Sequence, residues 1–247
     1  MKALLSFFTV VPVCGVSLDE AAREAYLLPL VGIVTGLPGA FLLLTAYFIP
    51  PGVVSTLALG TVLLAAGLHH ADGVLDVGDA LMVRGSAERR RAVLKDTRVG
   101  IGGIGALFLV YAPSVAALIA LSTTSPIRAA LVLLAGEVAA RSAMVFTLAY
   151  GEPAEAGSSS VPFVRALSGP RHTFAVTLAL LAPLPFFFPM GALAPLAVLA
   201  APLAAPLVAL LALRLSSMTL GGIGGDVVGA TGEACRAVVL ITISAIM

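Results

Sequence analysis

The chain has 247 residues, of which 60% are apolar and only 11% are charged. Soluble domains carry about 25% charged residues, so this composition excludes a water-soluble globule. The near balance of 14 basic and 13 acidic side chains excludes a nucleic-acid-binding protein, which would show a basic excess. We therefore expect an all-α, polytopic membrane protein with a single transmembrane domain over residues 1–247.

The apolar stretches predict about seven membrane spans. A helix that crosses the hydrocarbon core needs about 20 mostly apolar residues, and on that rule we expect spans near 27–49, 53–68, 103–121, 127–149, 174–190, 192–213 and 227–247. Pro183 and Pro185 are expected to kink the fifth span. Residues 3–14 are too short to cross, so we expect an interfacial or re-entrant segment there.

The basic residues predict the orientation of these spans. If seven spans alternate, Arg128 falls on one side and eleven basic residues fall on the other: Lys2, Arg23, Arg84, Arg89, Arg90, Arg91, Lys95, Arg98, Arg165, Arg171 and Arg214. Loops rich in Lys and Arg face the cytoplasm. The large loops are therefore expected to be cytoplasmic, and the C-terminus is expected outside.

Three aspartates after the second expected span form the first candidate site. Asp72, Asp76 and Asp79 are spaced by four and three residues, so on a helix they lie within about 60° of one another and share one stripe. Such like charges repel unless a divalent cation neutralises them, and oxygen ligands favour Mg²⁺, then Mn²⁺ or Ca²⁺. The alternative is a solvated helix face paired with nearby arginines. A continuous helix would place His69 near this stripe and His70 nearly opposite.

A basic segment and a glycine run follow the aspartates. They comprise Arg89-Arg90-Arg91, then Lys95-Asp96-Thr97-Arg98, then Gly100-Ile-Gly-Gly103. Acidic residues for Mg²⁺, cations and exposed glycine N–H groups together suit a diphosphate ligand, which the basic side chains, Arg89 included, would bind. Positive-inside topology alone remains the alternative for Arg90 and Arg91. Close helix packing remains the alternative for the glycines.

Two further polar features lie within or beside expected spans. Glu137 and Arg141 are four residues apart in the fourth span. Charged groups inside a membrane indicate a functional site, here substrate binding, unless they form a structural ion pair. The segment Gly221–Glu233 carries Asp226 among glycines that include Gly222 and Gly225. Its backbone could bind phosphate and its carboxylate could bind metal, whereas a flexible hinge is the alternative.

These motifs resemble the cobalamin synthase (adenosylcobinamide-GDP ribazoletransferase) family. That family carries the pattern His-Leu-Asp-Gly-Leu-Ala-Asp-Thr-Ala-Asp-Gly, which residues 70–80 follow at each histidine and aspartate, with Ala80 in place of the last glycine. Its Lys-Asp-Ser-Arg-Ile-Gly block resembles residues 95–100, and its late glycine-aspartate block resembles residues 221–226. The match runs from the N-terminus to about Glu233, although residues 150–173 fit it poorly.

The resemblance implies an enzyme that catalyses the last step of nucleotide-loop assembly. In that step the ribose hydroxyl of α-ribazole, or of its 5′-phosphate, attacks the phosphate attached to cobinamide in adenosylcobinamide-GDP, and GMP leaves. The implied partners are these small molecules and the lipid bilayer of the cell membrane. Whether the protein forms a homo-oligomer is left open.

The resemblance also implies roles for individual residues. Mg²⁺, or Mn²⁺, would be held by Asp72, Asp76 and Asp79. Asp96 or Asp226 would complete the site as a ligand or as the general base, and Lys95 and Arg98 would neutralise the diphosphate and the leaving GMP. The motif favours His70 over His69 as a site residue, which a break in the helix before the aspartates would reconcile with the spacing.

Two other functions use similar residues. A CDP-alcohol phosphotransferase also holds a divalent ion with several aspartates on membrane helices. Its signature, Asp-x-x-Asp-Gly-x-x-Ala-Arg, is not met, since Gly73 precedes Asp76 and no Ala-Arg follows. A divalent-ion transporter would place its site at the bilayer midplane, often in repeated halves. No internal repeat is visible, and the aspartates are expected at the cytoplasmic edge.

Overall fold

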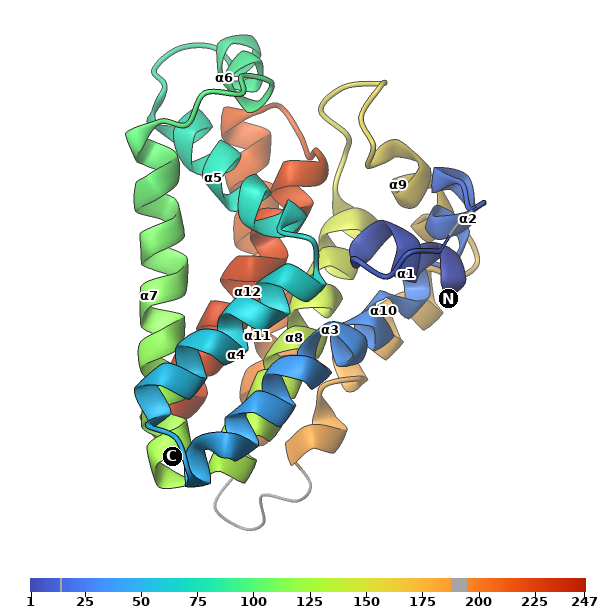
Figure 1. Ribbon diagram of the computed structural model, residues 1–247. Helices are drawn as coiled ribbons and strands as arrows, with labels where there is room; N and C mark the ends of the chain where they lie inside the picture. Colours follow the sequence, from blue (N-terminus) through green and yellow to red (C-terminus); the bar gives the residue numbers. More distant parts are fainter. Residues whose placement is uncertain (14, 188–194) are drawn as a thin grey trace.

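The computed structural model describes residues 1–13, 15–187 and 195–247 and shows a helical bundle (Figure 1). No strand occurs in these residues beyond an isolated bridge between Pro153 and Ile223. The all-α prediction is therefore confirmed. The elements, in chain order, are α1 (Lys2–Phe8), α2 (Leu18–Arg23), η1 (Ala25–Leu27), α3 (Leu28–Leu44), η2 (Thr45–Tyr47), α4 (Pro51–Ala65), α5 (His69–Met82), α6 (Ala87–Leu94), α7 (Ile101–Thr124), α8 (Pro126–Tyr150), α9 (Val161–Leu167), α10 (His172–Leu181), α11 (Pro195–Thr219) and α12 (Gly225–Ile246).

Helix α8 forms the centre of the bundle, where α3, α11 and α12 pack around it. Small residues bring the backbones together, as is usual for helices in membranes. A Cβ atom on Gly32 of α3 would lie 2.5 Å from the carbonyl oxygen of Glu137 in α8. A Cβ on Gly232 of α12 would lie 3.1 Å from the side chain of Met144. Nearly all of α8 is buried as a result.

Five helical segments are long and apolar enough to cross a membrane: Ala25–Tyr47, Ile101–Thr124, Pro126–Tyr150, Leu199–Thr219 and Gly225–Ile246. The pair α4 and α5 adds a sixth if it counts as one broken span. The multi-pass membrane character is confirmed, but the expected count of seven is not. The fifth expected span corresponds to the apolar helix His172–Phe187, which is too short to cross by itself; its α-helical part, α10, ends at Leu181, and a 3-10 turn follows at 184–187, around Pro185. Parts of two expected spans, 188–190 and 192–194, lie outside the described residues.

A sharp break separates α4 from α5, and the two helices meet at 94°. Gly67 and Leu68 both have positive φ angles, of 71° and 61°. Left-handed conformations end helices and favour glycine. The chain therefore restarts as a new helix at His69, immediately before the aspartates. From there α5 packs against α7 and α12 toward the end of the bundle that carries α6, which we call the α6 end (Figure 1).

Three connecting segments gather at the α6 end. They are α6 itself, the segment 151–160 before α9, and the loop 220–225 between α11 and α12 (Figure 1). The expected non-spanning segment near the N-terminus forms the short helix α1, which packs against α2 and α3. The C-terminus lies at the opposite end of the bundle (Figure 1).

Candidate functional site

The three aspartates lie on one helix, α5, as their spacing predicts. Asp72 is exposed, whereas Asp76 and Asp79 are partly buried. A fourth carboxylate joins them from α12, because Asp76 lies within electrostatic range of Asp72, Asp79 and Asp226. The late glycine-aspartate segment and the early aspartate stripe therefore belong to one cluster, although about 150 residues separate them in the sequence.

Glycine brings these two helices into contact at the cluster. A Cβ atom on Gly73 would lie 2.7 Å from the backbone oxygen of Asp226 and 3.0 Å from its Cα. One turn further into the bundle, a Cβ on Gly229 would lie 3.2 Å from His70. Only glycine permits this approach, so Gly73 and Gly229 set the distance between the carboxylates of α5 and Asp226.

Asp79 has a second, structural task. Its carboxylate accepts hydrogen bonds from the backbone N–H groups of Gly100, at 2.7 Å, and Gly103, at 2.8 Å. These N–H groups belong to the first turn of α7, which has no cap from its own N-cap residue. The glycine run also packs closely on α5, since a Cβ on Gly102 would lie 2.8 Å from the Gly78 oxygen. The structure thus favours the packing alternative, and the Gly100 and Gly103 N–H groups do not face a phosphate.

The carboxylate cluster has the chemistry of an open metal site rather than of a closed one. Among the described residues, no three His, Cys, Asp or Glu side chains converge closely enough to form a ready-made metal cage. In the same part of the chain, however, Asp72, Asp76 and Asp226 make no ion pair with a basic side chain. Mg²⁺ in phosphoryl-transfer sites is usually held by one or two carboxylates, waters and substrate phosphates. Unpaired carboxylates of this kind fit that open type of site.

Two basic residues of α6 and its C-terminal turn are tied to a carboxylate from the segment 151–160. The Lys95 ammonium lies 2.8 Å from one oxygen of Glu155, and the Arg91 Nε lies 3.2 Å from the other. Arg91 also donates a hydrogen bond of 2.6 Å to the carbonyl oxygen of Leu220. The hydrogen bond from Lys95 lowers the pKa of Glu155. Arg91 thus has specific partners. A residue that only sets the membrane orientation by its positive charge would not need them.

Arg98 lies apart from this pair and contacts Asp96. Its Nη2 is 2.7 Å from the Asp96 Oδ2, and its side chain is 88% exposed. This hydrogen bond lowers the pKa of Asp96. Asp96, Arg98 and Asp79 border a cavity of about 300 Å³. Arg89 is exposed on α6. Its backbone N–H donates a hydrogen bond to the side chain of Ser86, the residue that caps this helix.

A larger polar cavity of about 460 Å³ lies between α6, the segment 154–159 and the loop 220–227. The loop is shaped by Gly221 and Gly222, whose φ angles are 79° and 147°. It is fixed by backbone hydrogen bonds from Ile223 to Glu152 and from Ala154 to Ile223. Helix α12 then begins at Gly225 without a side-chain cap. Its first N–H groups, which favour an anion, lie at the cavity, and so does Asp226.

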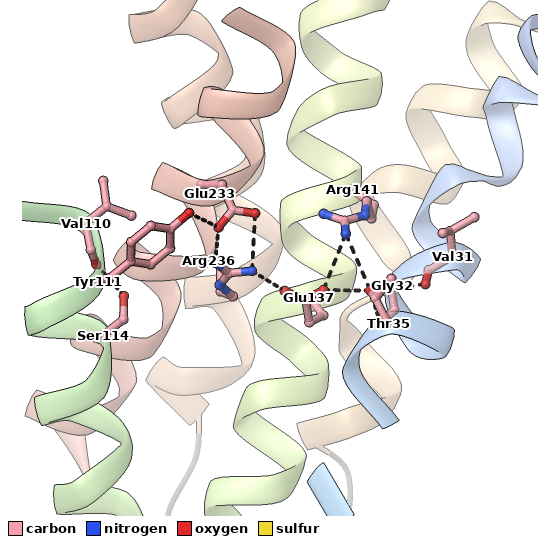
Figure 2. Close-up of polar contacts among 10 residues, drawn as sticks. All are labelled: Val31, Gly32, Thr35, Val110, Tyr111, Ser114, Glu137, Arg141, Glu233 and Arg236. Atoms are coloured by element: carbon pink, nitrogen blue, oxygen red, sulfur yellow. Dashed lines mark hydrogen bonds and ion pairs between the residues drawn. The ribbon is translucent and has the colours of Figure 1, made fainter. Parts of the chain in front are cut away.

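Glu137 and Arg141 are fully buried and belong to a network that sequence reasoning did not assemble (Figure 2). Glu137 lies 2.7 Å from Arg236 of α12 and accepts a 2.7 Å hydrogen bond from Thr35 of α3. Arg236 also pairs with Glu233, which accepts a 2.9 Å hydrogen bond from Tyr111 of α7. The network joins four helices, which favours the structural ion pair over a substrate contact. Glu233 and Arg236, three residues apart, were the sequence signal for it.

The two histidines at the start of α5 point in different directions. His69 is exposed, whereas His70 is buried against Gly229 and lies 6.0 Å from the Phe8 ring, between centroids. The Nδ1 atom of His70 has no hydrogen-bond partner among the described residues. The break that would reconcile the spacing with the motif is present directly before His69. It does not turn His70 onto the exposed aspartate stripe.

Comparison with known proteins identifies the family. A family model described as cobalamin-5-phosphate synthase matches residues 1–244. The chain belongs to this family. A protein of Pyrobaculum calidifontis named adenosylcobinamide-GDP ribazoletransferase is 37% identical over 98% of the chain and 97% of its own length. A protein of the same name from Methanococcoides burtonii is 30% identical over 99% of the chain and 91% of its own length. No solved structure matches the chain significantly.

The motifs shared with the cobalamin synthase family come together at the α6 end. Residues 70–79 lie on α5, residues 95–100 join α6 to α7, and residues 221–226 form the loop before α12. Family membership confirms that the protein is an enzyme. Segment 150–173, which resembled the family pattern least, supplies Glu155 and part of the 460 Å³ cavity, a contribution the sequence did not indicate.

Proposed function

We propose that this protein is a Mg²⁺-dependent membrane transferase that joins adenosylcobinamide-GDP to α-ribazole, or to α-ribazole 5′-phosphate, and releases GMP. The product is adenosylcobalamin or its 5′-phosphate. The observation that carries the proposal is the carboxylate cluster of Asp72, Asp76 and Asp226, which has no ion-pair partner in the described chain and from which Asp226 lines the 460 Å³ cavity. The relatives' name supports the choice of substrates.

In this reaction the ribose hydroxyl oxygen bonds to the phosphorus attached to cobinamide. The bond from that phosphorus to the bridging oxygen breaks, and GMP leaves with that oxygen. Such transfers depend mainly on positioning and on charge neutralisation. Asp72, Asp76 and Asp79 would hold Mg²⁺, which when bound supplies positive charge to the phosphate oxygens. Lys95 and Arg98 would bind phosphate oxygens from either side of the cluster.

The proton of the attacking hydroxyl needs a base, and Asp226 suits this role better than Asp96. Arg98 holds the Asp96 carboxylate through a hydrogen bond and lowers its pKa, which makes Asp96 a weaker base. Asp226 is partly buried beside the aspartate stripe and makes no ion pair in the described residues. We propose that Asp226 accepts the proton of the ribose hydroxyl and that Asp96 orients Arg98.

The distribution of basic residues supports an orientation in the cell membrane. Lys and Arg residues outside the spans concentrate at the α6 end, and such residues favour the cytoplasmic side. We propose that the carboxylate cluster and both polar cavities open to the cytoplasm. Nucleotide substrates would then reach them without crossing the bilayer.

A turnover assay on the purified protein tests the function. With Mg²⁺ and α-ribazole present, adenosylcobinamide-GDP should release GMP, and omission of α-ribazole or of Mg²⁺ should stop the release. Asp72→Asn and Asp76→Asn should each lower turnover severely, while Asp19→Asn, in α2, should not. Release of CMP from a CDP-alcohol, or divalent-ion uptake into proteoliposomes without GMP release, would replace the proposal with one of its rivals.

Arg98→Lys tests the phosphate contact. A bidentate contact needs the planar guanidinium, whereas a topological anchor needs only positive charge. The substitution should lower turnover by about tenfold or more. Arg84→Lys, in the exposed loop before α6, is the matched control and should leave turnover unchanged. Equal effects at the two positions would remove Arg98 from the site.

A further inference from the structure

Glu155 occupies the position of an anionic ligand in the 460 Å³ cavity. Its two carboxylate oxygens contact two different cations, Lys95 Nζ at 2.8 Å and Arg91 Nε at 3.2 Å, and all three residues line the cavity. The Glu155 side chain is 42% exposed, so it covers these cations without being packed into the core. A phosphoryl group presents oxygens to cations in the same manner.

The segment that carries Glu155 is anchored on both sides of it by hydrogen bonds that do not involve the Glu155 side chain. Backbone hydrogen bonds between Glu152, Ile223 and Ala154 fix the residues before Glu155 to the loop 220–225. After it, the Ser158 N–H donates to the Glu155 carbonyl oxygen at 3.1 Å, and the Ser160 hydroxyl donates to the Ile223 carbonyl oxygen at 3.5 Å. The Glu155 side chain can therefore leave the two cations without disturbing the backbone pairing.

We propose that this cavity is a subsite for a substrate phosphoryl group and that Glu155 is an internal anion which that group displaces. The inference rests on the proposed function and adds to it a binding site on the segment 154–159. Two sources share the required chemistry, the diphosphate of the nucleotide-linked substrate and the 5′-phosphate of α-ribazole 5′-phosphate. The 5′-phosphate monoester and the whole diphosphate each carry about two negative charges, against one for a carboxylate, and have more acceptor oxygens, so either outcompetes Glu155.

The displacement is energetically cheap. Exposed ion pairs contribute little to stability because solvent screens them. The carboxylate can therefore neutralise Lys95 and Arg91 while the cavity is empty and still yield to a phosphate. Removing its charge should strengthen phosphate binding by about two- to fivefold, which is the range that exposed ion pairs supply.

A direct binding measurement tests the subsite without relying on turnover. Pyrophosphate and inorganic phosphate are titrated into the purified full-length protein in detergent by calorimetry. Glu155→Gln should bind pyrophosphate about two- to fivefold more tightly than wild type. Glu88→Gln is the matched control, because Glu88 also contacts Arg91, at 3.4 Å, but does not line the cavity. It should bind as wild type does.

Lys95→Gln provides the second arm, because its side chain is 68% exposed and its loss does not disturb the core. Pyrophosphate binding should weaken in this variant, and Glu155→Gln should strengthen it less in the double variant, where Arg91 is the only one of the two cations left to be uncovered. Equal or weaker binding by Glu155→Gln than by wild type would overturn the subsite. Because neither arm measures turnover, this result is independent of a failure of the proposed reaction.

Michaelis constants then distinguish the two phosphate sources. If the subsite takes the acceptor's phosphate, Glu155→Gln lowers KM for α-ribazole 5′-phosphate and leaves KM for α-ribazole unchanged. If it takes the diphosphate, the variant lowers KM for adenosylcobinamide-GDP with either acceptor. A rise of every KM together with a lower melting temperature would show that Glu155 only braces the fold, and would overturn the proposal.

Discussion

Asp79→Asn separates the structural role of this aspartate from that of its neighbours. The Asp79 carboxylate accepts two N–H bonds at the start of α7, at 2.7 and 2.8 Å. Asparagine keeps one oxygen, but its amide NH₂ would face the other N–H group. Helix caps are worth about 0.5–2 kcal/mol and hydrogen bonds to charged groups about 1.5–3 kcal/mol. Losing one such bond should cost about 1–3 kcal/mol, or a fall in melting temperature of about 2–10 °C.

The assay is thermal unfolding of the purified protein in detergent with a chelator, so that bound metal does not contribute to stability. Asp72→Asn is the matched control because it removes the same charge from the same helix without removing an N–H partner. It should melt at or slightly above the wild-type temperature, since repulsion on the stripe decreases. The capping argument would be refuted if Asp79→Asn had the melting temperature of wild type. It would also be refuted if Asp72→Asn lowered the melting temperature as much as Asp79→Asn does.

Three further predictions concern the packing of α5 on α12, the buried charges and the topology. Gly73→Ala would place a Cβ atom 2.7 Å from a backbone oxygen of α12, so α5 and α12 must separate and turnover should fall by about tenfold or more. Gly105→Ala is the control, because a Cβ atom there would have no atom within 4 Å, and it should leave turnover intact. Equal turnover in the two variants would contradict the argument. Glu137→Gln removes a buried charge between two arginines and should destabilise the fold by about 3–5 kcal/mol, seen as lost folded protein in detergent. In a cysteine-free background, an impermeant thiol reagent added to intact cells should label Phe48→Cys but not Glu88→Cys, and the reverse pattern would invert the topology.

Local patterns in the sequence predicted the elements that depend on local chemistry. The 3.6-residue periodicity placed Asp72, Asp76 and Asp79 on one helix, and uninterrupted apolar runs located α3, α7, α8 and α12 to within a few residues. The fifth expected span was less well predicted. The α-helical hydrogen bonds of α10 end at Leu181 and a 3-10 turn continues the apolar helix to Phe187, because Pro183 and Pro185 lack the N–H groups that would extend the α-helix.

Contacts between distant segments could not be read from the sequence. The glycine run at 100–103 has the composition of a phosphate-binding loop and of a helix-packing surface alike, and only the position of Asp79 distinguishes them. Glu155 lies in the segment with the weakest motif resemblance, and its partner Lys95 is 60 residues away. The loop 220–225 must first pair with residues 152–154 before the cavity exists.

The buried network bears on how the chain enters the bilayer. A charge at the centre of a lone helix opposes insertion by about 2.5–3.5 kcal/mol. Helix α8 carries Glu137 with Arg141 four residues later, and α12 carries Glu233 with Arg236 three residues later, so each helix brings its own counterion. Each can enter the membrane with these central charges paired within its own helix before the other is synthesised. The contact between Arg236 and Glu137 forms only when the two helices meet, which makes insertion and assembly separate steps in the biogenesis of this protein.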